Sequence, residues 1–219
     1  LRPLCNMRVA GRLKDGLLVR MMRAASCARR RSASGSTLFF EASPYLRGCV
    51  DLLPSIFEDP LVLHLVRDPR AYVTSYINHG AFSGAKGILG QLIPYWHLKP
   101  EHIDPDGALR WRTMDHHERI CWCWNALNRL IEEGAGSLPS DRYMRLRFED
   151  IIDPRNDGLA PLASALGVAP GTGGGTMNLD IRANESRNAL HPAADDWSEQ
   201  MVSVMYQYCG ERMRQYGYD

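Results

Sequence analysis

The sequence lacks any apolar run close to the roughly 20 residues that a membrane-spanning helix needs. It also lacks an excess of charge of either sign, because 26 Lys and Arg residues stand against 25 Asp and Glu residues, for a formal net charge of +1. A balanced chain is not drawn as a whole to polyanions, so any anion site must be local. We therefore expect no transmembrane segment in this chain and no nucleic-acid partner.

The six cysteines show no C-x-x-C spacing, and a chain of 219 residues does not need a disulfide scaffold. We expect reduced, partly buried thiols, although one or two bridges in a lumenal enzyme stay open. His117 and Cys121 lie one helical turn apart, but two such residues without a partner cluster are weak evidence for zinc. The sequence therefore predicts no metal site.

Segments with strand and helix patterns alternate along the chain. Residues 61–66 are apolar on both faces, as in a buried parallel strand, and residues 143–148 alternate polar and apolar. Amphipathic helices are predicted over 116–133 and 196–216. The alternation predicts a single α/β domain over residues 1–219, with a three-layer parallel sheet flanked by helices. Within it, residues 81–110 form a loop-rich insertion.

The turn after residues 61–66 has the features of an anion site. Asp68 is suited to cap a helix and Pro69 to begin it, so free N–H groups face the carboxyl end of the strand. Arg67 adds a guanidinium fork that matches phosphate oxygens, and Ser75 offers a hydroxyl two turns further on. The competing interpretation is a surface ion pair between Arg67 and Asp68, with Ser75 as a neutral helix residue.

The run Val62–Tyr76 resembles the 3′-phosphate-binding motif of sulfotransferases that use 3′-phosphoadenosine 5′-phosphosulfate (PAPS). That motif has an apolar strand, an Arg, turn residues, and a Ser eight positions after the Arg, as Arg67 and Ser75 are here. Phe40–Leu46 and Arg147–Asp150 resemble further family segments in the same order. The resemblance covers roughly residues 37 to 219 and leaves residues 1–36 poorly matched.

The resemblance implies a P-loop-like sulfotransferase architecture, PAPS as co-substrate, no metal, and an acceptor hydroxyl or amine, with carbohydrate mildly preferred. Arg67 and Ser75 would bind the 3′-phosphate, Phe148 would pack near the adenosine, and Arg187 would assist on the 3′-phosphate side. Glu41 is the candidate base that deprotonates the acceptor. A structural role for Glu41 at a strand end is an equal alternative.

The family's 5′-phosphosulfate loop, of the type Arg/Lys-Ser-Gly-Thr-Thr, has only one similar string here, Ser34–Leu38. We interpret that string as a turn, and we expect the first strand and the phosphosulfate loop to be missing from this chain. Two alternatives therefore stay open. One is a truncated or non-catalytic binding protein, and the other is a P-loop-like kinase or nucleotide hydrolase, which would lack the usual Gly-Lys-Ser/Thr. The compartment stays unknown at this point, with the cytoplasm open and also the Golgi lumen if an N-terminal anchor exists.

Overall fold

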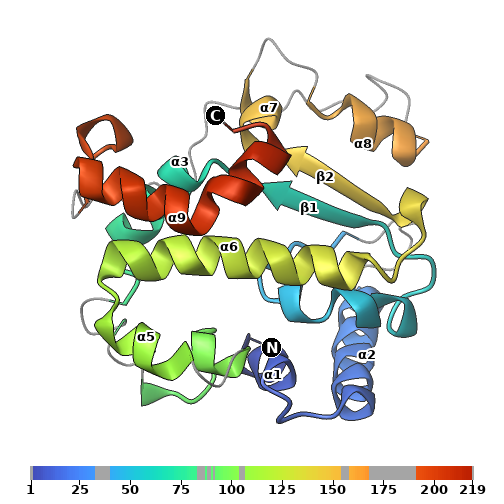
Figure 1. Ribbon diagram of the computed structural model, residues 1–219. Helices are drawn as coiled ribbons and strands as arrows, with labels where there is room; N and C mark the ends of the chain where they lie inside the picture. The colour runs from blue at the N-terminus through green and yellow to red at the C-terminus, as the bar shows by residue number, and fades with distance from the viewer. Residues whose placement is uncertain are drawn as a thin grey trace.

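The computed structural model describes residues 2–32, 40–82, 87, 90, 92–103, 107–153, 158–167 and 191–218 (Figure 1). Its helices are α1 (Arg2–Val9), α2 (Asp15–Ser32), α3 (Pro69–Asn78), α5 (Gly107–Thr113), α6 (His116–Ala135), α7 (Phe148–Ile152), α8 (Ala160–Ala165) and α9 (Glu199–Tyr216). The strands are β1 (Val62–Val66) and β2 (Tyr143–Arg147). Five short 3₁₀ helices complete the described elements: η1 (Leu46–Gly48), η2 (Val50–Ser55), η3 (Pro100–His102), η4 (Ser140–Arg142) and η5 (Ala194–Asp196).

The two strands pair in parallel, with Val62 opposite Tyr143 at one end and Val66 opposite Arg147 at the other. The predicted α/β class is confirmed at this level: the described chain is mostly helical, with a two-stranded parallel sheet. The larger sheet covered on both faces is not confirmed. Leu65, which alternates with the buried His64 and Val66, keeps 53% of its surface exposed, so this part of β1 is buried on one side only.

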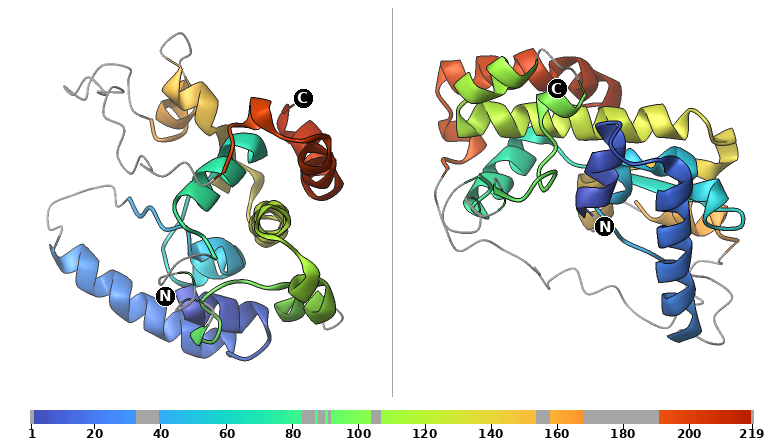
Figure 2. Two further views of the ribbon diagram at one scale, coloured as in Figure 1. Left: turned by 90° about the vertical axis from the view of Figure 1, so that its left-hand side faces the viewer. Right: turned by 90° about the horizontal axis from the view of Figure 1, so that it is seen from below.

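Helix α6 is the centre of the packing, and it runs across the middle of the molecule between the sheet with α9 and the N-terminal helices (Figure 1). Its stripe of Ile120, Trp124 and Leu127 is buried, as the periodicity predicts. Asp115 caps its start by accepting the Glu118 N–H at 2.8 Å. Seen along its axis in the left view of Figure 2, α6 has α9 and α3 on one side and α5 and α1 on the other.

Helix α9 closes the fold against α6. Ser198 caps its start by accepting the Met201 N–H, and Gly217 ends it with a φ of +74°, in the left-handed region that glycine enters without strain. Tyr218 follows at once and is buried. The C-terminus therefore returns to the sheet, next to α7 (Figure 1).

The cysteines are free thiols, as expected, with Cys27 exposed and the other five buried. Within the described ranges, no helix is both long and apolar enough to cross a bilayer. The start of the 81–110 insertion is described only in part. From residue 92 onward its described residues include η3, the buried His97 and Leu98, and the first turn of α5.

Candidate anion-binding site at the carboxyl edge of the sheet

The turn from β1 into α3 forms as its sequence predicts, but its ion pair differs. The Asp68 carboxylate accepts the Arg70 N–H at 2.8 Å, and Pro69 occupies the first helical position. The same carboxylate pairs with the Arg70 guanidinium at 2.7 Å. The surface ion pair considered for Arg67 and Asp68 is thus made by Asp68 and Arg70. Because Pro69 has no N–H and the Arg70 N–H is already bonded, the first turn of α3 offers an anion fewer donors than expected.

Arg67 lies at the carboxyl end of β1 without a carboxylate partner among the described residues. Its guanidinium carbon lies 5.1 Å from the centre of the Phe148 ring, a cation–π contact. Its Nε atom is buried and has no hydrogen-bond partner within the described part of the chain. The Arg67 carbonyl accepts the indole N–H of Trp124 at 2.9 Å, which fixes the backbone beneath the side chain. The structure therefore presents an oriented, permanently charged fork at this edge.

The parallel register brings Phe148 to Arg67. Since Val66 pairs with Arg147, the residues that follow them, Arg67 and Phe148, leave neighbouring strands at the same edge of the sheet. Strand β2 ends at Arg147, one residue before the predicted end, and Phe148 begins α7. Two of the predicted site residues are thus brought into contact.

Glu149 joins the two turns at this edge, a role that sequence reasoning missed. One of its oxygens accepts the Asp68 backbone N–H at 3.0 Å, and the other accepts the Tyr218 hydroxyl at 2.7 Å. Burial, together with the Glu149 carboxylate, raises the pKa of Tyr218, so this hydroxyl stays a donor. Glu149 follows Phe148 directly within the segment that resembles the family, and its acidity next to a predicted anion site was the available signal.

A second guanidinium holds the C-terminus to this edge. Arg147 donates from Nη1 to the Gly217 carbonyl at 3.0 Å, and its guanidinium lies 4.6 Å from the centre of the Tyr218 ring. Asp150 lies 3.7 Å from its Nε. Arg147 is thus placed against Asp150, as Arg70 is against Asp68, and Arg67 is the guanidinium at this edge without a carboxylate partner among the described residues.

A chain of hydrogen bonds supports Arg67 from the interior. The Tyr143 hydroxyl lies 2.8 Å from His64 Nδ1, and His64 Nε2 lies 2.8 Å from the Asn128 side-chain oxygen. The Asn128 amide donates to the Trp124 carbonyl at 2.7 Å, and Trp124 in turn donates to Arg67. We refer to these five residues, 143, 64, 128, 124 and 67, as the interior chain. Burial lowers the pKa of His64, and a neutral His64 ring makes every hydrogen bond of the interior chain.

The other predicted site residues lie in different surroundings. Ser75 is half-buried on α3, on the side opposite the buried Pro69, Val73 and Ile77, since two residues span about 200° of a helix. Glu41 lines a mostly apolar cavity of about 210 Å³, whose other walls come mainly from α1, α2 and η1. Arg187 and the Ser34–Leu38 string lie outside the described residues.

Comparisons of this chain with protein-family models, with curated proteins and with solved structures find no match.

Proposed function

We propose that this chain is the donor-binding part of a sulfotransferase that moves a sulfuryl group from PAPS to an acceptor hydroxyl or amine. The observation that supports the proposal is Arg67, a cation without an ion-pair partner in the described chain, held against an aromatic ring where two parallel strands end. Ligands of open α/β sheets bind at this edge.

The residues of the edge fit a phosphate. A guanidinium offers a phosphate two parallel hydrogen bonds, and contact with Phe148 restricts the plane in which those bonds point. The nearby Glu149 carboxylate would repel an anion, but both its oxygens already accept hydrogen bonds, from Asp68 and from Tyr218. The Asp68 carboxylate is likewise neutralised by Arg70. With Arg147 set against Asp150, the charge of Arg67 is the one that the described residues of this edge leave for a ligand.

PAPS, when bound, supplies the activated sulfuryl group. Arg67 binds the donor's 3′-phosphate, the Ser75 hydroxyl donates to the same phosphate, and Phe148 packs beside the adenosine. Arg187 assists on the 3′-phosphate side. Glu41 accepts the proton of the acceptor, for which we propose a carbohydrate hydroxyl first. The other walls of its cavity are mostly apolar side chains, and burial of this kind favours a carboxylate that accepts a proton.

Calorimetric titration with adenosine 3′,5′-bisphosphate tests the donor site. We expect Arg67→Ala to weaken binding by about tenfold or more, since it removes a charge-assisted pair of bonds, and Ser75→Ala to weaken it by less. Arg142→Ala is the matched control, because Arg142 is half-buried and bonds Asp59 at the opposite end of β2. Binding equal in the parent and Arg67→Ala, or a preference for ATP, contradicts the proposal.

The alternative is a non-catalytic protein that binds the same nucleotide, and the edge of the sheet supports it equally. Transfer of labelled sulfate from PAPS to a panel of hydroxyl acceptors separates the two. Binding with no transfer by the full-length protein would identify a binding protein. Transfer that is lost in Glu41→Gln, with bisphosphate binding kept, would identify the enzyme and its base.

A further inference from the structure

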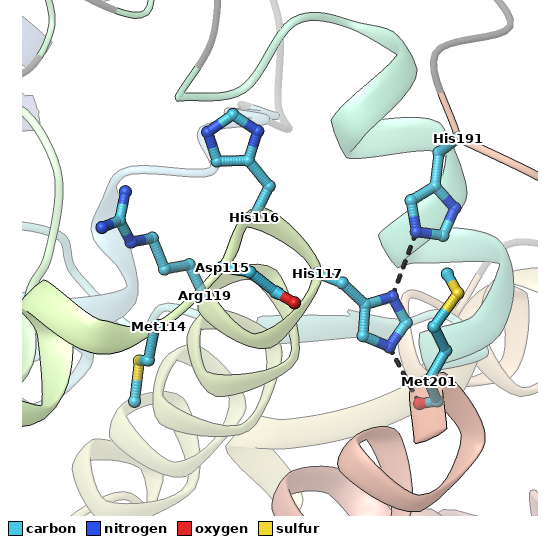
Figure 3. A pocket seen from close by; sticks show the side chains of 7 residues that line it. All are labelled: Met114, Asp115, His116, His117, Arg119, His191 and Met201. Atoms are coloured by element: carbon cyan, nitrogen blue, oxygen red, sulfur yellow. Dashed lines mark hydrogen bonds between the residues drawn. The ribbon is translucent and has the colours of Figure 1, made fainter. Parts of the chain in front are cut away.

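Two buried histidines meet at the start of α6, away from the carboxyl edge of the sheet (Figure 3). His117 Nδ1 lies 3.1 Å from His191 Nε2, although the two residues are 74 positions apart in the sequence. The rings are nearly parallel, at 5°, and their exposed fractions are 6% and 9%. The Trp197 ring packs against both histidine rings at nearly right angles, with centroid distances of 4.7 and 5.6 Å. We call these two residues the histidine pair.

The outer nitrogens of the pair both face backbone carbonyls. His117 Nε2 lies 3.0 Å from the Met201 carbonyl, and His191 Nδ1 lies 3.0 Å from the Pro192 carbonyl. A carbonyl oxygen only accepts hydrogen bonds, so each of these nitrogens must carry a hydrogen. The backbone N–H of His191 also donates to the Asn78 side chain at 2.9 Å, at the end of α3.

The proton count follows from these contacts. A neutral imidazole has one N–H and one lone pair, so two neutral rings hold two protons. Their two outer bonds use both protons, and the two inner nitrogens would then face each other as bare lone pairs at 3.1 Å. The three bonds are made together only when a third proton lies between His117 Nδ1 and His191 Nε2.

We propose that His117 and His191 share one extra proton as an imidazole–imidazolium pair, and that this proton holds residues 191–201 against α6 and α3 as a pH-sensitive clasp. Loss of the proton leaves one inner or outer bond unmade inside a buried site, which is costly. The clasp is independent of the nucleotide site proposed above.

The groups around the histidine pair favour one positive charge. On α6, Asp115 acts on both rings and Cys121 contacts His117, and contacts with Cys209 and His117 lower the pKa of the Cys121 thiol to about 6. His116 and Arg119 line the same open cavity of about 590 Å³ and point away from the pair (Figure 3). On the facing elements, the pair meets the carbonyls of 192 and 201, the Trp197 ring and the Asn78 amide, none of which titrates in this range. Asp195, Asp196 and Glu199 are exposed to solvent.

A proton, and not a metal ion, suits the pair. The described residues contain no group of three His, Cys, Asp or Glu side chains that could hold a metal. The two inner nitrogens also point at each other along a hydrogen bond, as Figure 3 draws it. A metal ion would need their lone pairs to converge on a common point.

The direction of the pH effect follows from the two pKa shifts. Burial alone lowers the pKa of His117, but Cys121, the Met201 carbonyl and Asp115 outweigh it and leave that pKa raised. Burial lowers the pKa of His191. An unfolded histidine titrates near about 6.5, so the folded pair holds one proton on both sides of that value. Stability is therefore lost as the pH rises through the raised pKa, and again as it falls through the lowered one.

Nuclear magnetic resonance of the ring nitrogens in the unmodified protein tests the shared proton directly. We expect both rings to respond to one common titration step above the ordinary histidine range and to a second step below it. Two rings that titrate independently, each near the ordinary value, overturn the proposal. This measurement needs no variant and holds even if a substitution prevents folding.

The pH dependence of unfolding tests the clasp. Between the ordinary histidine value and the upper midpoint, the unfolding constant of the parent should rise by up to about tenfold per pH unit, as one bound proton requires, and it should level off above that midpoint. His191→Asn keeps a donor for the Pro192 carbonyl and removes the inner nitrogen, so this rise should disappear. His116→Asn, an exposed neighbour on the same cavity, should keep it. Equal pH profiles of the unfolding constant for the parent and His191→Asn overturn the proposal. It is also overturned if the substitution speeds amide exchange at residues 191–201 by the same factor at every pH.

Discussion

The interior chain and the histidine pair bury their imidazoles to similar extents, yet they need different charges. His64 is 2% exposed and receives one donor, the Tyr143 hydroxyl, while it gives one N–H to Asn128, so a neutral ring satisfies every contact. In the histidine pair, two of the four ring nitrogens face backbone carbonyls and the other two face each other. All three of these hydrogen bonds form only when the pair holds one added proton. The number of donors and acceptors around a buried histidine, more than its burial, decides its charge.

The two networks also lie at opposite ends of α3. The interior chain ends at Arg67, which precedes the first turn of α3, and the histidine pair reaches Asn78, its last residue. The first end therefore carries a fixed charge and the second a titratable one. Under the two proposals above, the first end of α3 would bind an anion through a fixed charge, and the second end is a contact that pH can release.

Asn128→Asp should have the largest effect, because it converts the neutral interior chain into a charged one. The new carboxylate lies where the Asn128 oxygen now faces His64 at 2.8 Å, so the pKa of His64 should change from lowered to raised. At pH 8 the buried carboxylate beside a neutral ring should cost about 2–4 kcal/mol. At pH 6 the imidazolium should recover part of that loss.

Urea unfolding at pH 6 and pH 8 measures whether the pKa shift of His64 changes from lowered to raised. Asn125→Asp is the matched control, since Asn125 is on the same helix and its oxygen accepts from Arg212, which a carboxylate also satisfies. Asn125→Asp should be as stable as the parent at both pH values. A variant at Asn128 that loses more stability at pH 6 than at pH 8 would contradict the neutral description of His64.

Trp124→Phe should have the next largest effect, because it breaks the interior chain next to the candidate anion site. Trp124 is 2% exposed, and its indole N–H is the donor to the Arg67 carbonyl at 2.9 Å. The unsatisfied carbonyl should cost about 1–3 kcal/mol, and the lost ring volume adds to this. Binding of adenosine 3′,5′-bisphosphate should also weaken, because the backbone of Arg67 is then held less firmly.

Trp122→Phe is the control for Trp124→Phe, since Trp122 is on the same helix, is partly buried and packs on Trp111. It should lose packing energy but keep bisphosphate affinity. Equal losses of affinity in the two variants would show that the Arg67 carbonyl does not couple the interior chain to the site.

Local chemistry made much of the fold predictable. The apolar run before Arg67, the Asp68 cap with Pro69 after it, and the 3.6-residue stripe of α6 each fix an element through contacts within a few residues. The extent of the sheet was not predictable in the same way. An apolar strand is compatible with one covered face or with two, and Leu65 shows that at least part of β1 has one.

In the candidate site, too, local contacts were predictable from the sequence and long-range contacts were not. Contact between Arg67 and Phe148 follows from two strand ends and a parallel register, which a motif can indicate. The roles of Glu149 and Tyr218 depend on the return of the C-terminus to the sheet, and the histidine pair joins residues 74 positions apart. No local pattern encodes such contacts, because they arise from how α6, α9 and α3 pack.

Tyr218→Phe should have the smallest effect of the three substitutions, and it tests how far the fixed charge of the anion site depends on its surroundings. The change removes only the hydroxyl that donates to Glu149 at 2.7 Å and keeps the ring over Arg147. We expect a loss of about 1.5 kcal/mol, at the low end for a hydrogen bond to a charged group, and bisphosphate binding a few-fold weaker. One oxygen of Glu149 then loses its donor, so the negative charge of this carboxylate is less screened where we propose that the phosphate binds. Tyr206→Phe, on the exposed side of α9, should change neither quantity. If Tyr218→Phe binds the bisphosphate as tightly as the parent, the Glu149 carboxylate acts on the turn alone and not on the ligand.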